Sequence, residues 1–288
     1  MSILFRRARN TLLILVACAL LFEARFAYLA HPWDANRLTV WVFDVGQGDA
    51  IFIDAPEKQV LIDGGPDNKV LDRLSAVMPF YDTSIDLVVA THPHADHVTG
   101  LDAALDRYQV DNVWWNGEGY NSDEERAFED DFAMTDAEIP KMGETYDLGN
   151  GATLQVMYVP SLTLHQTMED PNDASIVCLL TYGETTMLLT GDSGMEQEAL
   201  FEGALPHVDV LKVGHHGSDT STSSALLKQI TPDAAVISVG EHNRYGHPDP
   251  VVVDRLERLR IPTWRTDLNG SIRITTDGGE PTVEAFRF

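Results

Sequence analysis

The segment Ile85–His97, IDLVVATHPHADH, decides what can be inferred about the fold and chemistry of this chain. Its first six residues form an apolar, β-rich run that is typical of a buried strand. Three histidines and an aspartate follow within six residues, in the pattern H-x-H-x-D-H. Divalent metals take imidazole nitrogen and carboxylate oxygen at about 2.0–2.2 Å. The segment therefore predicts a metal site at the end of a buried strand.

The spacing inside this segment suggests two metals. His92 and His94 lie two residues apart and can point the same way, whereas Asp96 and His97 lie further into the turn. We expect the first pair at one metal and the second pair at another. The alternative is a solvated histidine-rich turn, in which crowding these polar groups together would bring no gain in packing.

Two later segments end in residues of the same kind. MLLTGD, at 187–192, places Asp192 after an apolar run, where it can bridge two metals or simply belong to a turn. DVLKVGHHG, at 209–217, places His215 and His216 after a second run. A second cluster of metal-type residues at a strand end strengthens the prediction of a metal centre.

The composition limits the classes of function. The chain has 288 residues, of which 44% are hydrophobic and 23% charged, values that exclude collagen, coiled coils, general disorder and a polytopic membrane protein. Its 20 basic and 45 acidic residues give a net charge of −25. Affinity for a polyanion comes mainly from Lys and Arg, so bulk attraction to nucleic acid is not expected. Any phosphate chemistry would depend on local cations.

The rest of the chain alternates predicted strands with predicted helices. This alternation favours an α/β layered fold in one domain, residues 32–288, with two similar halves. The acidic segment 121–132 is interpreted as a solvated helix or excursion. Strands are expected at 38–44, 50–54 and 59–63, as an antiparallel meander, and at 85–90, 110–115, 174–181, 185–189, 208–213 and 234–239; helices are expected at 70–78, 97–107, 195–202, 223–230 and 251–259.

Residues 1–31 are predicted to be a signal peptide or a signal anchor. Three arginines precede the uncharged run TLLILVACALLF at 11–22, which is shorter than the ~20 residues of a spanning helix. The arginines predict a cytoplasmic N-terminus and a membrane-anchored or secreted catalytic domain outside the cytoplasm. Lipidation at Cys18 and a helix buried against the domain are the alternatives. No feature points to a protein partner, and Cys178 is expected to be a buried thiol.

Seven segments together resemble a known family. The order of these segments along the chain resembles that of the metallo-β-lactamase superfamily. Their amino-acid sequences resemble the hydrolase domain of ComEC-type DNA-uptake proteins, from about residue 38 onward. The resemblance implies a four-layer αββα sandwich with the site at one edge. The segments are DVGQGDA (44–50), LIDGG (61–65), THPHADH (91–97), NDASIV (172–177), LLTGD (188–192), DVLKVGHHGS (209–218) and VISVGEHNRYGHP (236–248).

The resemblance also implies ligands for two divalent ions, zinc or manganese. It assigns one metal to His92 and His94, the other to Asp96 and His97, and the bridge to Asp192. His215 or His216 would complete the second metal; the strand pattern does not choose between them, and we prefer His215.

The usual third histidine of the first metal is missing. Asn172 and Asp173 stand at its place, so one of them is expected to ligate weakly, or His165 to swing in.

Further residues are candidates for catalysis or support. The catalytic candidates are Asp96, Lys212 and His247. For His247 the two interpretations are that it donates a proton to the leaving oxygen and that it has only a structural role in its loop. Ordinary turns and helix capping are the alternatives for several of the rest. Candidates that would orient ligands or contact substrate are Asp44, Gln47, Asp49, Asp63, Ser218, Asn243 and Tyr245.

The predicted function is a metal-dependent phosphodiesterase or nuclease. Two divalent ions lower the pKa of a bound water towards ~7, which produces hydroxide to attack phosphorus. The expected partner is a phosphodiester, with DNA as the candidate polymer, and the membrane through the N-terminal segment. The alternatives are an ester, thioester or lactam hydrolase, and a tethered module that binds DNA or wall polymer without catalysis.

Overall fold

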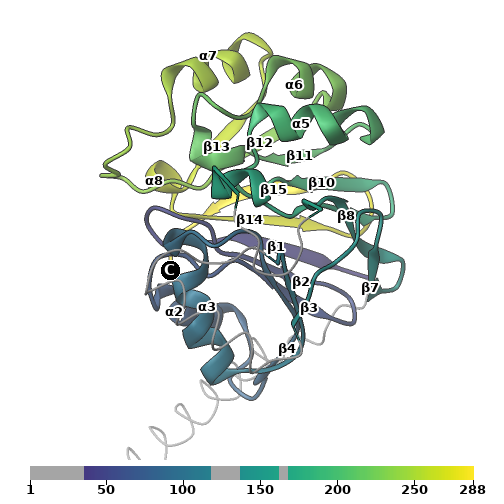
Figure 1. Cartoon of the computed structure of the whole chain (residues 1–288). Coiled ribbons are helices and arrows are strands. Elements are labelled where there is room, and N and C mark those ends of the chain that lie inside the picture. The colour runs from purple at the N-terminus through teal and green to yellow at the C-terminus, as the bar shows by residue number, and fades with distance from the viewer. Residues whose placement is uncertain (1–35, 118–136, 162–167) are drawn as a thin grey trace, which may run out of the picture. The chain divides into compact units, whose positions relative to one another are not determined.

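Two β-sheets face each other in the computed structural model, which describes residues 36–117, 137–161 and 168–288 (Figure 1). All of these residues belong to the unit Ala35–Phe288. The predicted leader 1–31, the boundary at residue 32, the acidic segment 121–132 and His165 lie outside the described residues. Within the described ranges, none of the helices combines the length and apolar character needed to span a membrane.

The first sheet has eight strands in the order β15-β14-β1-β2-β3-β4-β5-β6. Antiparallel pairing joins β1, β2 and β3, which confirms the predicted meander. Parallel pairing joins β3 to β4 and β4 to β5. The bounds are β1 Leu38–Val42, β2 Ile51–Asp54, β3 Gln59–Ile62, β4 Ser84–Ala90, β5 Gln109–Trp115, β6 Ala137–Glu138, β14 Ser271–Thr276 and β15 Thr282–Phe286.

The second sheet has seven strands in the order β13-β12-β11-β10-β9-β8-β7. Strands β10 to β13 run parallel to one another, whereas β7, β8, β9 and β10 pair antiparallel. The bounds are β7 Thr145–Gly149, β8 Ala152–Tyr158, β9 Val177–Tyr182, β10 Thr185–Leu189, β11 Val210–Lys212, β12 Ala234–Ile237 and β13 Thr263–Arg265.

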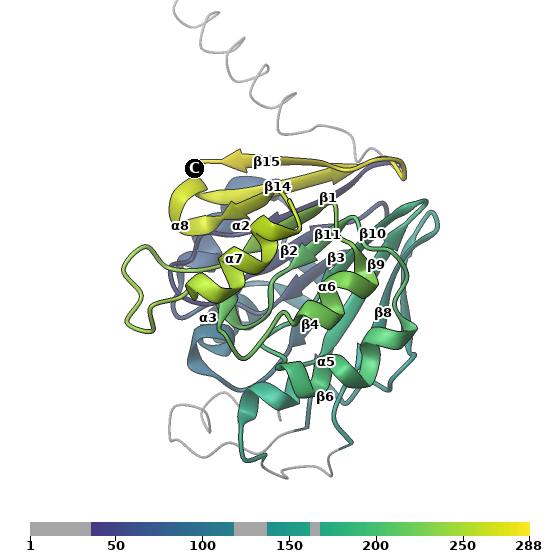
Figure 2. The same cartoon turned by 90° about the horizontal axis from the view of Figure 1, so that it is seen from above.

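Helices cover the outer face of each sheet, which gives the predicted four layers (Figures 1 and 2). Helices α2 and α3 lie on the first sheet, and α5, α6 and α7 lie on the second. Short 3₁₀ turns, η1 to η3, lie at Pro171–Ala174, Glu202–Ala204 and Gly214–Gly217. The helices are α2 Lys69–Val77, α3 Ala95–Arg107, α5 Met195–Phe201, α6 Ser224–Ile230, α7 Pro250–Arg258 and α8 Thr266–Asn269.

The side-chain alternation of the strands fills separate cores. In β4, Leu87 and Val89 join the core between the two sheets, whereas Val88 and Ala90 join the core beneath α2 and α3. Successive side chains of a strand point to opposite faces, so a strand that is apolar throughout must be covered on both. This explains why IDLVVA has no polar alternation after its second residue.

The parallel pairs bring the polar strand ends to one edge. Ile62 pairs with Val89, so the residues that follow β3 and β4 leave the first sheet side by side. Leu189 pairs with Lys212, so the residues after β10 and β11 leave the second sheet together. The H-x-H-x-D-H turn, Asp192 and the histidine pair thereby reach the same edge of the sandwich.

Some elements differ from the prediction. Helix α3 begins at Ala95, two residues earlier than expected, which places Asp96 and His97 in its first turn. Six strands were not predicted: β6, β7, β8, β13, β14 and β15. The pairing of β14 with β1 joins Thr276 to Leu38, a contact between opposite ends of the domain that local sequence patterns do not indicate.

Asp54 gives a prediction about stability. Burial raises its pKa to about 6, and the nearby Asp82 adds to this effect. Its Oδ1 is buried without a hydrogen-bond partner. A raised pKa means that the folded state holds the proton more tightly than the unfolded state, so stability is lost as the pH rises from about 4 to about 6. Asp54→Asn should therefore raise the free energy of unfolding at pH 8 by about 1–3 kcal/mol.

The measurement is urea unfolding of both proteins at pH 4 and pH 8. The difference between variant and wild type should be small at pH 4 and larger at pH 8. A difference that does not change between the two pH values would contradict the assignment.

Candidate metal centre

The carboxylate of Asp192 lies close to the side chains of four histidines. Its Oδ2 lies 3.3 Å from Nε2 of both His97 and His216. The same oxygen lies 3.9 Å from Nε2 of His92 and of His215. The structure thus brings together three segments that are far apart in sequence, as the prediction of a bridging Asp192 requires.

The buried rings present their Nε2 atoms because their Nδ1 atoms are already engaged. His97 Nδ1 lies 2.8 Å from Asp63 Oδ2, and His216 Nδ1 lies 2.9 Å from the carbonyl oxygen of Ser238. Both acceptors require a proton on Nδ1, which leaves Nε2 free as a ligand. The Nδ1 atom of the third buried ring, His92, is also engaged, because it lies 3.0 Å from the Thr91 hydroxyl oxygen.

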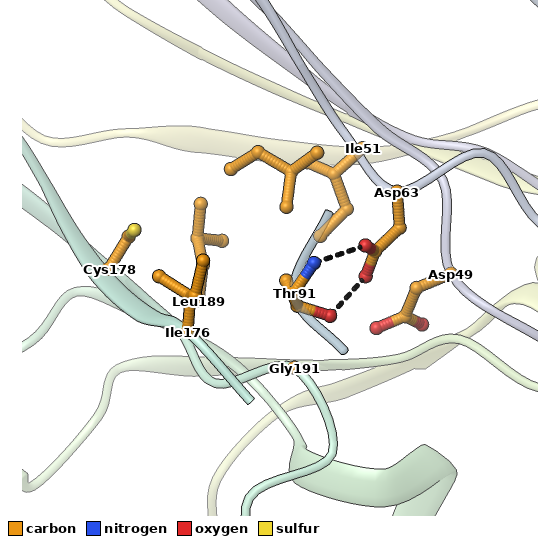
Figure 3. A pocket seen from close by; sticks show the side chains of 9 residues that line it. Asp49, Ile51, Asp63, Thr91, Ile176, Cys178, Leu189 and Gly191 are labelled. Atoms are coloured by element: carbon orange, nitrogen blue, oxygen red, sulfur yellow. Dashed lines mark hydrogen bonds between the residues drawn. The ribbon is translucent and has the colours of Figure 1, made fainter. Parts of the chain in front are cut away.

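Asp63 links the turn after β3 to the histidine turn. Its carboxylate accepts hydrogen bonds from the backbone N–H of Thr91 at 2.9 Å and from the Thr91 hydroxyl at 2.7 Å (Figure 3). With the bond from His97, it therefore fixes two sides of the H-x-H-x-D-H segment. Asp63 itself adopts a left-handed backbone, with φ 56°. Its predicted role as a residue that orients ligands stays a prediction, which metal affinity can test.

A small cavity lies behind this hydrogen-bonded group (Figure 3). Asp49, Asp63 and Thr91 form its polar side, and the buried Cys178 is among the residues of its apolar side. Burial raises the pKa of the Cys178 thiol to about 12, so this side chain is neutral at physiological pH. The expectation of a buried thiol is confirmed.

Asp49 and Lys212 form a buried ion pair beside the cluster. Lys212 Nζ lies 2.7 Å from Asp49 Oδ2 and also donates to the carbonyl oxygen of Val213. Asp49 Oδ1 lies 3.5 Å from His216 Nδ1. Lys212 is only 1% exposed, so the structure does not place it where it could touch a substrate, contrary to the catalytic role suggested from the sequence. It supports the position of Asp49 instead.

The charges of the cluster depend strongly on one another. Burial opposes ionisation of Asp192, but His216 and His97 outweigh it and hold its pKa well below the ordinary value. Burial likewise opposes protonation of His97 and His216, but the neighbouring carboxylates raise the pKa of both rings well above the ordinary value. His92 behaves differently, since burial and the nearby His97 lower its pKa. Positive charge is therefore strongly favoured at this point, and a divalent cation can supply it.

Unpartnered oxygens show that the residues fit metal ions. Within the described ranges, Oδ1 of Asp49, of Asn172 and of Asp192 is buried without a hydrogen-bond partner. Groups of three ligand atoms lie within 4.8 Å of one another; two of these groups are His92–His97–Asp192 and Asp96–His97–His216. Nitrogen and oxygen donors of this kind suit zinc or manganese.

The histidine pair requires a correction. His216 Nε2 lies 3.4 Å from Asp96 Oδ2 and 3.3 Å from His97 Nε2, whereas His215 is partly exposed and its Nδ1 contacts Thr220. The preference for His215 beside Asp96 and His97 was therefore wrong, and His216 occupies that position. Both histidines have left-handed backbones, with φ 46° and 53°, a turn that strand alternation could not predict.

The other predicted metal residues lie around this core. His94 Nδ1 is 3.2 Å from His92 Nε2, at the start of α3. Asn172 lies in η1 and lines a pocket together with Asp192 and His215. Asn172 therefore stays a candidate ligand for the metal held by His92 and His94.

The remaining candidates divide between the pocket and the scaffold. The His247 ring lies 5.6 Å from that of His215, and burial and His215 lower its pKa. Gln47, Asn243 and Tyr245 line a second pocket. Asp44 accepts a hydrogen bond from the N–H of Gly46. Ser218 contacts Thr220 through its hydroxyl and donates its backbone N–H to the carbonyl oxygen of His215, so it supports the histidine turn.

Sequence reasoning missed four residues that position the site. Besides Thr91 and Ser238, Ser175 accepts a hydrogen bond from the N–H of Asp192, and the buried Glu198 accepts from the N–H groups of Thr222 and Ser223. All four act through contacts between distant segments. Thr91, Ser175 and Ser238 lie inside the segments that carry the family resemblance, which is the sequence signal that could have found them, whereas Glu198 lies outside these segments.

These features define the class of protein. The family model of the metallo-β-lactamase superfamily matches residues 43–242, and the chain belongs to this superfamily. It is a metal-dependent hydrolase, of a fold that typically binds two divalent ions.

Curated relatives extend the comparison. The chain is 30% identical to ComE operon protein 3 of Bacillus subtilis over 86% of its own length and 34% of the relative, and 29% identical to Recombination protein 2 of Haemophilus influenzae over 86% and 30%. It therefore spans about a third of these relatives. Among solved structures, the metallo-β-lactamase fold protein YhfI of Bacillus subtilis matches with a TM-score of 0.54 at 12% identity, covering 83% of this chain and 99% of that one.

The role of Asp63 can be tested by metal affinity. Asp63→Asn keeps the size of the side chain but replaces an ionised acceptor, so the His97 ring loses the partner that fixes its Nδ1 proton. Substitution of a residue that orients ligands typically weakens metal binding by about 10–100-fold. Competition for zinc with a chromophoric chelator measures this loss, with circular dichroism to show that the variant is folded. Asp72→Asn, at an exposed position of α2, is the matched control; equal affinities of the two variants would refute the role.

Proposed function

We propose that this hydrolase cleaves phosphodiester bonds, with DNA as the candidate substrate. The convergence of four histidines on Asp192 Oδ2 carries the proposal, because it provides ligands for a bridged pair of divalent ions. Such a pair, when bound, activates water and neutralises charge on a phosphoryl group. The similarity to competence proteins, including Competence protein ComA of Neisseria gonorrhoeae at 24% identity, supports DNA as the substrate.

The residues of the site have different proposed roles. The residues that would hold the metals are His92, His94, Asp96, His97, Asp192 and His216, with Asn172 and His215 beside them. Asp96 is partly exposed, so it marks the open side of the cluster, where a substrate can approach. His247 is half-buried near His215, and a lowered pKa leaves its ring neutral at pH 7. A neutral ring can take up a proton from water and then pass it to the leaving oxygen, and His247 is the candidate for this role.

Hydrolysis of a thioester is the second candidate. The chain is 28% identical to Hydroxyacylglutathione hydrolase of Ruegeria pomeroyi, over 83% of this chain and 82% of that one. The same donor set can serve a carbonyl as well as a phosphoryl group. We favour the phosphodiester because Asn172 replaces the third histidine and because the competence proteins are similar. We also propose that the domain works outside the cytoplasm, on the strength of the sequence of residues 1–31.

The test is a substrate screen with zinc or manganese. Single- and double-stranded DNA, bis-p-nitrophenyl phosphate and a glutathione thioester are each supplied, and released nucleotides, nitrophenol and thiol are measured. We expect turnover of the phosphodiesters, and loss of at least about 10²-fold in kcat/KM for Asp96→Ala. Turnover of the thioester alone would establish the second candidate, and binding of less than one equivalent of metal without any turnover would indicate a module that only binds.

A further inference from the structure

Two pockets of opposite character reach the candidate metal centre. One, the cationic pocket, has a volume of about 450 Å³ and meets the centre at Asp96. The other, the acidic pocket, has a volume of about 340 Å³ and meets it at Asp192 and His215. They share no lining residue, so a substrate that enters the cationic pocket meets different chemistry from one that enters the acidic pocket.

The cationic pocket combines two exposed cations, Lys69 and Arg244. Lys69, at the start of α2, is exposed; its Nζ lies 3.6 Å from Asp67 Oδ2 and donates to the carbonyl oxygen of Val45. Arg244 is exposed in the 241–245 loop and donates to the Tyr245 hydroxyl at 2.8 Å. Asp96, which belongs to the metal centre, is the one carboxylate among the described residues that line this pocket. Phosphates beyond the centre would therefore meet two cations.

Tyr245 adds a flat surface beside these cations. Its side chain is 53% exposed, and its ring lies nearly parallel to that of His247, with 5.8 Å between centroids and 13° between planes. The Arg244 guanidinium lies 5.0 Å from the centroid of the same ring. An exposed aromatic ring next to cations is the usual arrangement for single-stranded nucleic acid, because bases stack on the ring while phosphates pair with the cations.

The acidic pocket has the opposite charge. Asp170, Asp173 and Glu196 line it, and no Lys or Arg is among its described lining residues. These three carboxylates repel one another and any further anion. A further phosphate on this side would add to the same repulsion.

We propose that a single-stranded polynucleotide lies on one side of the metal centre only, with phosphates at Lys69 and Arg244 and a base on Tyr245, while the acidic pocket excludes phosphates beyond the scissile bond. This rests on the proposed phosphodiesterase function. The scissile bond then lies at or next to the end of the strand. One water is consumed for each bond: its oxygen joins phosphorus, the bond from phosphorus to the leaving oxygen breaks, and that oxygen takes up a proton.

Binding tests the cationic pocket separately from catalysis. A fluorescein-labelled phosphorothioate dT12, which is hydrolysed slowly, is titrated with the full chain in manganese, and anisotropy is recorded at several salt concentrations. The double variant Lys69→Glu with Arg244→Glu should weaken binding at least 10-fold and reduce the salt dependence. Tyr245→Ala should weaken binding several-fold, and Tyr245→Phe should restore it, because the ring and not the hydroxyl carries the stacking.

Arg258→Glu is the charge-reversal control, with half the change in net charge of the double variant, since Arg258 lies on α7 with its side chain 81% exposed and lines neither pocket. It should bind dT12 as the wild type does. Equal binding by the double variant and by Arg258→Glu would overturn the assignment of the cationic pocket.

Circular and linear single-stranded DNA of the same sequence test the one-sided placement. Linear DNA should be degraded from an end and the circle should resist, whereas Glu196→Lys should increase cleavage of the circle. Equal cleavage of both forms by the wild type would overturn the placement and leave the phosphodiesterase function standing. Absence of hydrolysis of both DNAs and of bis-p-nitrophenyl phosphate would overturn the function itself.

Discussion

Partnering of buried charge is the constraint on which the rest of this structure depends. Three carboxylates, three histidines and one lysine are almost completely buried where the two sheets end: Asp49, Asp63, Asp192, His92, His97, His216 and Lys212. Each would be costly alone, because a buried charge without a partner loses its hydration. The strand ends, the left-handed backbone at Asp63 and at the histidine pair, and the close approach of neighbouring loops all serve to bring these groups together.

This arrangement separates two kinds of role. Asp63, Thr91, Ser238 and the Asp49–Lys212 pair bind the outer sides of the histidine rings or the residues beside them, so they determine which ring nitrogen faces the centre. The inner atoms, Nε2 of the histidines and the oxygens of Asp96 and Asp192, are the ones available to metal. Rigid positioning of this sort lowers the cost of reorganisation during a reaction.

The distribution of charge outside the centre reconciles an acidic protein with a phosphodiester substrate. A net charge of −25 repels polyanions at long range, but screening limits this repulsion to about 8 Å at physiological ionic strength. Within that distance, the local groups decide what binds. Lys69 and Arg244 line one pocket at the centre and three carboxylates line another, so the position of the charges matters more than their sum.

Much of the fold followed from local pattern, because apolar runs and helical spacing report directly on burial. The β1–β3 meander, β10 at Thr185–Leu189 and most helices were predicted within a few residues. Strand β14 was missed because it is completed by pairing with β1, more than two hundred residues earlier, and β15 pairs in turn with β14. The N-terminal segment lies outside the described residues, and its role stays a prediction.

The sequence by itself determined which residue types gather at the strand ends, and hence the kind of centre and the fold that holds it, because metal ligation requires particular atoms at close spacing. Only the tertiary structure decided that His216 and not His215 joins Asp96 and His97, that Lys212 is buried against Asp49, and that the two pockets differ in charge. These outcomes depend on backbone conformation and on contacts between distant segments, which no local pattern encodes.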